Sequence, residues 1–435
     1  MQRRDFLKTS ALATGALMMP FSLWAKDDKI NLAIVGTGWW GREILLQRAL
    51  ATDRFNVVGL CDVNQTALQK ASEVVVKAGN PKPKLFKDYR QMYDMPELEA
   101  VVIATPTHWH ALQFIAACEK GLDVFLEKPI SYDIREGQKM LEAHKKALNI
   151  VTVDFPRVMF DTNEQVKAYI NSGAAGEIVQ AKANINHHEG LRVEKAIPNT
   201  LDYEAFCGPA PKVSYMTSPD GEAWDWRGQH AFSRGILADW GIHYIHNIRK
   251  VLDLDLPASI NAIGGTVKNF SHDNPDYLDV KFDFNGKPVY WSHKTWGYTS
   301  DRPETNIGVY YYGEKATIFA GDIGWEVYPA DGSATIVNGN IRFNADPSFM
   351  AKAFKAIEGL FTQFAGAIRS RSTDGIPVPL EDAYTTTAAV IYADIAFRTD
   401  SKIAINKNTM DIVNNGSAQA LLKRAYRESY KHPFS

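Results

Sequence analysis

The stretch that decides the fold is INLAIVGTGWWGR, residues 30–42. Its first six residues are mostly apolar and predict a buried strand, and residues 42–51 predict a helix. The turn between strand and helix has the spacing G-x-G-x-x-G and consists of Gly36, Thr37, Gly38, Trp39, Trp40 and Gly41. Such a turn directs backbone N–H groups and the positive end of a helix dipole at one spot, which suits a diphosphate. The stretch therefore predicts a dinucleotide site.

The next predicted strand, FNVVGLCD, supports this interpretation because it ends in an acidic residue. Asp62 follows Gly41 by roughly 20 residues, the spacing expected for a carboxylate that binds an adenosine ribose. Asp62 would repel a 2′-phosphate, and Val63 and Asn64 supply no arginine to accept one. The pattern favours NAD over NADP. The alternative, an ordinary glycine turn beside an aspartate at a strand end, leaves this combined spacing unexplained.

Strand and helix patterns alternate over residues 29–155, which predicts an N-terminal Rossmann domain with a doubly wound parallel sheet. Ligands of such sheets bind beyond the carboxyl ends of the strands. Two strand ends should border the crevice, and their polar residues are Thr105, Pro106 and His110 after AVVIA, and Glu127 and Lys128 after DVFL. We expect Lys128 near the nicotinamide, where a cation can polarise a reacting hydroxyl. The alternative for Lys128 is a solvated loop residue.

A second domain, residues 156–410, has an α+β pattern. Residues 235–253 predict an amphipathic helix on which Asp239 and His243 are four residues apart and share a face. Such a carboxylate can orient an imidazole while the imidazole exchanges a substrate proton. The alternative is a surface pair without catalytic role. Beyond Pro257, alternating segments separated by turn residues predict a large open antiparallel sheet, and residues 411–435 predict a helical tail that packs on the body.

Length and composition agree with two domains and argue against several classes of protein. A chain of 435 residues is too long for one core, and 45% hydrophobic and 23% charged residues are typical of a soluble globular protein. There is no apolar run long enough for an integral membrane segment. The net charge of −2 and the lack of a basic stripe argue against nucleic-acid binding. The three cysteines form neither a disulfide framework nor a zinc pattern.

The N-terminus predicts export. Residues 3–8, RRDFLK, form a twin-arginine pattern followed by a mildly apolar stretch, so residues 1–25 are expected to be a signal peptide read by the Tat export machinery. The alternative is a chance arginine pair. Because this route carries folded proteins, we expect a periplasmic protein that acquires its nucleotide before export.

In combination, these motifs resemble the glucose–fructose oxidoreductase/inositol dehydrogenase family, also called Gfo/Idh/MocA. The resemblance covers residues 29–406 and rests on AIVGTGWWG, LCDVN, VVIATPTHWH, EKP, INSGAAGEI and ILADWGIHYIHNIRKVLD. It implies that Lys128 and His243 flank the nicotinamide and the reacting carbinol, with His243 as acid/base and Asp239 steering it. It also implies that His110 lies near the cofactor ribose, and that the open sheet mediates a homo-oligomer. Trp39 and Trp40 depart from the family, which usually has smaller residues there.

Exposed aromatic residues favour a sugar or glycoside as substrate. The expected pocket residues are His187, His188, Arg192, Trp226, Arg227 and His230. We expect no metal site, because these histidines lack a recognised ligand spacing. The predicted function is hydride transfer between a ring hydroxyl of a sugar and a tightly bound NAD. One alternative is an NAD-dependent glycoside hydrolase that oxidises the 3-hydroxyl transiently and eliminates the aglycone. Another is a non-catalytic periplasmic sugar-binding protein.

Overall fold

The computed structural model describes residues 29–186, 188–221, 224–267, 273–297, 307–339 and 348–434. The predicted signal peptide, residues 1–25, and the predicted substrate residue His187 lie outside this part of the chain. Within the described residues, no helix is both long and apolar enough to pass through a bilayer.

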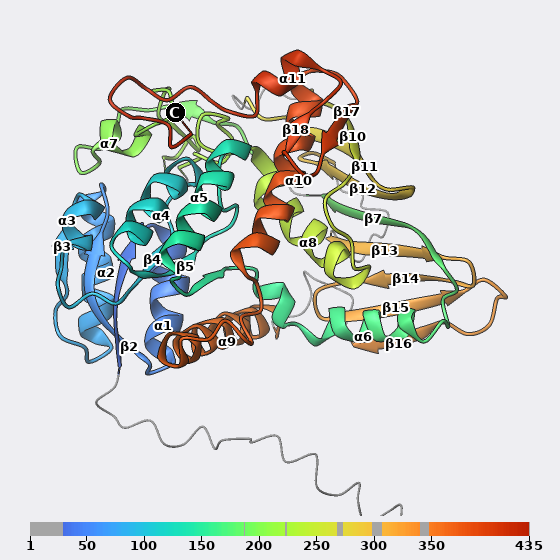
Figure 1. Cartoon of the computed structure of the whole chain (residues 1–435), viewed down its shortest axis with the longest axis horizontal. Helices are drawn as coiled ribbons and strands as arrows, with labels where there is room; N and C mark the ends of the chain where they lie inside the picture. The colour runs from blue at the N-terminus through green and yellow to red at the C-terminus, as the bar shows by residue number, and fades with distance from the viewer. Residues whose placement is uncertain are drawn as a thin grey trace, which may run out of the picture.

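The first domain is a six-stranded parallel sheet in the order β3-β2-β1-β4-β5-β6, which confirms the doubly wound Rossmann prediction (Figure 1). Its strands are β1 (Ile30–Val35), β2 (Phe55–Cys61), β3 (Lys84–Phe86), β4 (Ala100–Ile103), β5 (Asp123–Leu126) and β6 (Val151–Val153). The helices between them are α1 (Gln47–Ala51), α2 (Gln65–Lys77), α3 (Tyr89–Tyr93), α4 (His110–Glu119) and α5 (Ile134–Ala147). β1 and β4 are neighbours, so the glycine turn after β1 lies where the order of the strands reverses. This is where such sheets bind ligands.

A helix from late in the chain completes the core of the first domain. α9 (Ser348–Ser370) lies beside α1 in Figure 1, although most of the second domain precedes it in sequence. Its buried residues Ile357, Phe361 and Phe364 join the core built from β1, β2 and β5. The rings of Phe361 and Phe125 stack with centroids 4.2 Å apart. The two domains are therefore connected by a shared hydrophobic core as well as by the chain.

The second domain is built on a ten-stranded sheet in the order β16-β15-β14-β13-β7-β12-β11-β10-β17-β18. The predicted antiparallel sheet is confirmed with one qualification, because β7 and β12 pair in parallel. The strands are β7 (Ile178–Asn186), β10 (Ser259–Gly265), β11 (Tyr277–Phe284), β12 (Lys287–Lys294), β13 (Ile307–Gly313), β14 (Ala316–Ala320), β15 (Gly324–Pro329), β16 (Ile336–Gly339), β17 (Ile403–Asn406) and β18 (Asp411–Ile412). The helices are α6 (Asp161–Asn171), α8 (Ile242–Val251) and α10 (Leu380–Arg398). α8 and α10 lie between this sheet and the first domain in Figure 1.

A segment between β7 and α8 folds over the first domain, and we call residues 188–221 and 224–234 the roof segment. It contains β8 (Val193–Glu194), α7 (Tyr203–Cys207) and β9 (Met216–Thr217). Its aromatic residues form a small hydrophobic core of their own around Phe206 and Phe232. It also pairs with the chain that follows Asp62, because the N–H of Asp202 donates to the carbonyl of Val63 at 3.0 Å. The roof segment thus lies next to the predicted ribose site.

The C-terminal tail returns to the first domain, but the predicted helix is wrong for most of its length. Only α11 (Gly416–Ala420) is helical, and residues 421–434 run as turns and extended chain. Side-chain bonds to the first domain and to the roof segment replace helical bonds there. Arg424 donates to Glu136 at the start of α5, and Arg427 donates to the carbonyl of Gly208 in the roof segment.

Candidate functional site

The glycine turn has the close backbone packing that a diphosphate site requires. Gly36 has φ of +88°, and a Cβ there would lie 2.6 Å from the carbonyl carbon of Ala104. A Cβ on Gly41 would overlap the carbonyl oxygen of Gly36, whereas one on Gly38 would meet no protein atom within 4 Å. The space beside Gly38 is therefore open to a ligand. A helical segment begins at Trp40 as a π-helical turn, Trp40–Leu46, and continues as α1.

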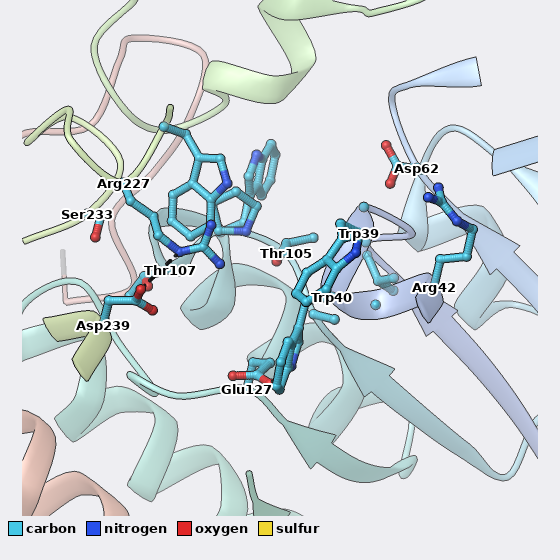
Figure 2. A pocket seen from close by; sticks show the side chains of 18 of the residues that line it. Trp39, Trp40, Arg42, Asp62, Thr105, Thr107, Glu127, Arg227, Ser233 and Asp239 are labelled. Carbon is cyan, nitrogen blue, oxygen red and sulfur yellow. Dashed lines mark hydrogen bonds and ion pairs between the residues drawn. The ribbon is translucent and has the colours of Figure 1, made fainter. Parts of the chain in front are cut away.

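The two tryptophans leave the turn open. Trp39 is 61% exposed, so its indole extends into the opening rather than filling the turn. Trp40 extends across to the end of β5, where its indole N–H donates to Glu127 Oε1 (Figure 2). Trp40 thus connects the glycine turn to the residue that precedes Lys128.

Asp62 lies at the end of β2 and faces the glycine turn. Its Oδ2 accepts hydrogen bonds from the backbone N–H of Thr37 at 2.6 Å and from its hydroxyl at 3.1 Å, and its Oδ1 accepts from the N–H of Asn64 at 2.7 Å. Burial raises the pKa of Asp62, and the hydrogen bonds from Asn64 and Thr37 oppose the rise. The carboxylate is therefore held in place beside the cavity, as a ribose ligand must be.

A single cavity of about 1240 Å³ connects the glycine turn to the second domain. The predicted residues that line it from the first domain are Gly36, Gly38, Trp39, Trp40, Gly41, Asp62, Thr105, Pro106, Glu127 and Lys128. Those that line it from the second domain are His188, Arg192, Trp226, Arg227, Asp239 and His243. In Figure 2, Asp239 and Arg227 lie across the cavity from Trp40 and Asp62. The volume exceeds that of many ligand pockets and can hold a dinucleotide with a small second ligand.

His110 does not line this cavity, so the expected contact with the cofactor ribose is not seen. Its ring is completely buried, with Nδ1 2.7 Å from the carbonyl oxygen of Pro129 and Nε2 2.7 Å from that of Thr105. Burial lowers the pKa of His110 to about 4. A neutral ring donates to one carbonyl only, so His110 braces the two strand-end loops from behind.

Lys128 and Asp239 bring the two domains together at the site. The ammonium group of Lys128 donates to Asp239 Oδ1 at 2.9 Å and to the Asp239 carbonyl at 2.7 Å. Arg227 Nε lies 3.4 Å from Asp239 Oδ2, the ion pair that Figure 2 marks with a dashed line. Asp239 therefore holds two cations at the cavity wall.

The expected steering of His243 by Asp239 is not the arrangement found. His243 Nδ1 is buried and has no hydrogen-bond partner among the described residues. Asp239 lies in a π-helical turn, Leu237–Gly241, that precedes α8, and its carboxylate is directed to Lys128 and Arg227. The spacing of four residues brings Asp239 and His243 to the same side of the cavity, but contacts with other parts of the chain determine which groups Asp239 binds.

His243 is a neutral base in a positively charged surrounding. It is 7% exposed and packs edge-on against Phe155, with ring centroids 5.6 Å apart. Burial lowers the pKa of His243 well below its usual value, and the positive charges of Lys128 and Arg157 lower it further. The ring therefore remains unprotonated near neutral pH and can accept a proton from a ligand in the cavity.

The remaining predicted substrate residues divide into two groups. Trp226 lies under Arg227, whose guanidinium carbon is 4.3 Å from the ring centroid, and both line the cavity. His230 lies elsewhere, 3.4 Å from the buried Asp394. Its Nε2 can donate to Asp394, which forms an ion pair with Arg234, so His230 belongs to a structural cluster outside the cavity.

Several cavity residues were missed in the sequence. Asp154 and Arg157 line the cavity just beyond β6, and the carboxyl-end rule for parallel strands could have identified Asp154. Tyr430 also lines the cavity and packs edge-on against Trp109, with ring centroids 5.5 Å apart. No sequence signal connects a residue so near the C-terminus with the nucleotide domain.

One group of acidic and histidine side chains among the described residues has metal-like spacing, and it lies outside the cavity. It consists of Asp133, Glu136 and His432. Arg424 already donates to this group, from its backbone N–H to Asp133 and from its guanidinium to Glu136, each at 3.0 Å. A buried arginine supplies the positive charge that a metal would bring, so the group anchors the tail.

These features define a nucleotide-binding oxidoreductase: a Rossmann sheet with an open glycine turn, an aspartate at the end of the next strand, and a lysine and a histidine that two domains bring to one cavity. Family comparison agrees. The NAD-binding Rossmann fold of the oxidoreductase family matches residues 30–155, and the C-terminal alpha/beta domain of that family matches residues 157–269. The chain belongs to the Gfo/Idh/MocA oxidoreductase family.

Individual relatives are distant. A glycosyl hydrolase family 109 protein of Stenotrophomonas maltophilia is 27% identical over 249 residues, which cover 54% of this chain and 51% of that protein. The chain thus matches about half the length of this relative. An oxidoreductase from Agrobacterium radiobacter in complex with NAD+, L-tartaric acid and magnesium has a TM-score of 0.64 at 16% identity, covering 86% of this chain and 98% of that one. An aldose–aldose oxidoreductase from Caulobacter crescentus has a TM-score of 0.63 at 15% identity, covering 87% and 100%.

Proposed function

We propose that the protein is an NAD-dependent oxidoreductase that transfers hydride between nicotinamide and a ring hydroxyl of a sugar or glycoside. The observation that carries this proposal is the convergence of Lys128 from the first domain and His243 from the second on one cavity that begins at the glycine turn. Bound there, NAD supplies a hydride acceptor and donor.

The protein residues would handle the proton and the orientation of the hydroxyl. Lys128, held by Asp239, presents N–H donors that can bind a carbinol oxygen and stabilise the negative charge that develops on it. His243, neutral at working pH, accepts the hydroxyl proton as the C–H hydride leaves, and returns it in the reverse direction. Trp226 and Arg227 offer an aromatic face and hydrogen-bond donors to the sugar.

We further propose that the nucleotide is NAD rather than NADP and that it stays bound during turnover. Asp62 disfavours a 2′-phosphate at the ribose. Residues of the roof segment and Tyr430 line the cavity, and the roof segment bonds to the chain that follows Asp62, so both would add contacts that retain a nucleotide. A retained cofactor also agrees with the predicted Tat export of a folded protein to the periplasm. We propose a homo-oligomer, which light scattering on the purified protein would detect.

The direct test is to purify the protein, denature it and measure released NAD(H) by absorbance and mass. We expect close to one nucleotide per chain. Sugars and glycosides are then screened for a change in the absorbance of the bound nicotinamide. Lys128→Ala and His243→Ala should slow that change by about 10²-fold or more while the bound nucleotide remains. Purified protein that neither contains nor binds NAD(P) would refute the proposal.

A second candidate function is favoured by one finding, the 27% identity with a glycosyl hydrolase family 109 protein. In this version, transient oxidation of the 3-hydroxyl acidifies the C2 proton, a base removes that proton, and the aglycone leaves before water adds. The ketone at C3 then takes the hydride back from the reduced nicotinamide, so that no NAD is consumed overall. Lys128 and His243 would serve both reactions. Aryl glycosides separate the two, because release of the phenol without added NAD indicates hydrolysis. A 3-keto-glycoside that retains its aglycone indicates oxidation alone.

A non-catalytic sugar-binding protein is the remaining alternative. It predicts sugar binding without any change in the nicotinamide spectrum, and it predicts that Lys128→Ala and His243→Ala bind sugar as the unmodified protein does. Calorimetry on the three proteins distinguishes it from both enzymes.

A further inference from the structure

Two carboxyl groups lie side by side at the ends of neighbouring strands, beneath the cavity. Glu127 follows β5 and Asp154 follows β6, and these strands pair in parallel with Leu126 opposite Val153. The N–H of Asp154 donates to the carbonyl of Leu126 at 2.9 Å, which keeps the two strand ends together. Asp154 is 1% exposed and Glu127 is 6% exposed. Two negative charges in such a place would repel each other with little water to screen them.

Hydrogen-bond donors are distributed unequally between the two carboxyl groups. Glu127 Oε1 accepts from the indole N–H of Trp40, and its Oε2 accepts from the backbone N–H of Lys128 at 3.0 Å. Neither oxygen of Asp154 has a hydrogen-bond partner among the described residues. A buried carboxylate without donors is costly, and a protonated carboxyl group can instead donate to a neighbouring carboxylate. The proton therefore belongs on Asp154 and the charge on Glu127.

The charged groups near Asp154 agree with this assignment. Burial raises the pKa of Asp154 well above its usual value, and the negative charge of Glu127 raises the pKa further. The ammonium group of Lys128 and the indole of Trp40 oppose the rise. Glu127 and Lys128 follow β5, and Trp40 belongs to the glycine turn.

We propose that Asp154 is a positioning residue that stays protonated and donates a hydrogen bond to Glu127, which in turn fixes Trp40 of the glycine turn and the backbone of Lys128. The acid pair then carries one negative charge at the place where the glycine turn meets the proposed catalytic lysine. Its relevance to nicotinamide binding rests on the proposed function, whereas the proton on Asp154 does not.

The first measurement is infrared spectroscopy of the purified protein at neutral pH. A difference spectrum between the unmodified protein and Asp154→Asn should show the C=O stretch of one protonated carboxyl group, present only in the unmodified protein. On raising the pH, this band should persist well beyond the ordinary range of an aspartate. In Glu127→Gln the band should disappear at a lower pH, because the repelling charge is gone. Absence of the band, or a titration unaffected by Glu127→Gln, would overturn the assignment.

The second measurement is NAD+ binding by calorimetry on nucleotide-free protein, which needs no turnover. Asp154→Asn keeps an N–H donor for Glu127, so its affinity should stay within about two-fold of the original. Asp154→Ala loses the donor and should bind NAD+ roughly ten-fold more weakly, with folding checked by circular dichroism. Equal affinities in the two variants would refute the positioning role. The infrared band does not depend on any activity. Its absence would refute this inference and leave the proposed function untouched, whereas a protein that neither contains nor binds NAD(P) would refute the proposed function and leave the infrared result unchanged.

Discussion

Replacement of Asp322 by alanine should destabilise the second domain, because the change leaves a buried arginine without its counterion. Asp322 lies between β14 and β15, and its two oxygens accept hydrogen bonds from Arg157 Nε and from one terminal guanidinium nitrogen, each at 2.9 Å. The Tyr244 hydroxyl lies 3.1 Å from both oxygens. The side chains of Arg157 and Asp322 are 8% and 2% exposed, so water replaces little of what is lost.

The expected loss in the free energy of unfolding follows from this geometry. Removal of one partner of a buried, bidentate ion pair costs about 3–5 kcal/mol, because the remaining charge stays desolvated. Asp322→Asn keeps one acceptor oxygen and loses the charge, so we expect about 1.5–3 kcal/mol, the worth of a hydrogen bond to a charged group. A double variant, Arg157→Met with Asp322→Leu, should recover much of the loss, because no buried charge remains.

Differential scanning calorimetry is the assay. For a domain of this size about 1 kcal/mol corresponds to about 2–4 °C, so Asp322→Ala should lower the melting temperature by roughly 10 °C. The control is Lys84→Ala, which removes an exposed ion pair with Glu97 whose side chains are 62% and 37% exposed. It should cost less than about 1 kcal/mol. If Asp322→Ala and Lys84→Ala have the same melting temperature, the assignment of Arg157 and Asp322 as a stabilising pair is refuted.

Three further predictions concern the site. Gly41→Ala should lower thermal stability and weaken NAD+ binding, measured by calorimetry, more than ten-fold, because its Cβ would overlap the carbonyl of Gly36. The control, Gly38→Ala, should leave thermal stability unchanged, because its Cβ would meet no protein atom. The acid limb of the pH profile of kcat/KM should lie below pH 6.5, because the pKa of His243 is lowered. Lys128→Ala removes a positive charge that lowers this pKa, so the acid limb of its residual activity should move to higher pH. An acid limb at or above pH 6.5 in the unmodified protein would contradict the role of His243 as a neutral base. His243→Ala should reduce kcat by about 10²–10⁴-fold with the Kd for NAD+ unchanged, and an equal loss of NAD+ affinity would argue against a role in proton transfer.

Local sequence patterns predicted the first domain because its order is set by short-range rules. A glycine turn between a strand and a helix has few alternatives, and parallel strands bring their carboxyl ends to one edge. Lys128 was expected at that edge for this reason. The convergence of Lys128 with His243 came from the family resemblance, since no local rule connects residues so far apart in sequence.

Other features could not be derived locally because they depend on tertiary competition. The spacing of Asp239 and His243 was compatible with a bond between them, yet Lys128 and Arg227 are stronger partners for a carboxylate than a buried neutral imidazole. His110 was expected at the ribose, but two carbonyl groups behind the cavity wall hold its ring. The tail shows the same effect, because Arg424 gains more from Glu136 than a helix would supply.

The site depends on how firmly the two domains are joined, since each contributes one of its two proposed catalytic residues. Three connections fix their relative position: α9 in the core of the first domain, the ion pair of Lys128 with Asp239, and the hydrogen bond from the Tyr384 hydroxyl to the carbonyl of Ile134. An opening motion between the domains would expose the apolar residues that α9 buries in the first domain, at a cost of several kcal/mol. We therefore expect the Lys128–His243 wall to be preformed. Movement of the roof segment, which has a small hydrophobic core of its own, would then be the least costly way to exchange the nucleotide.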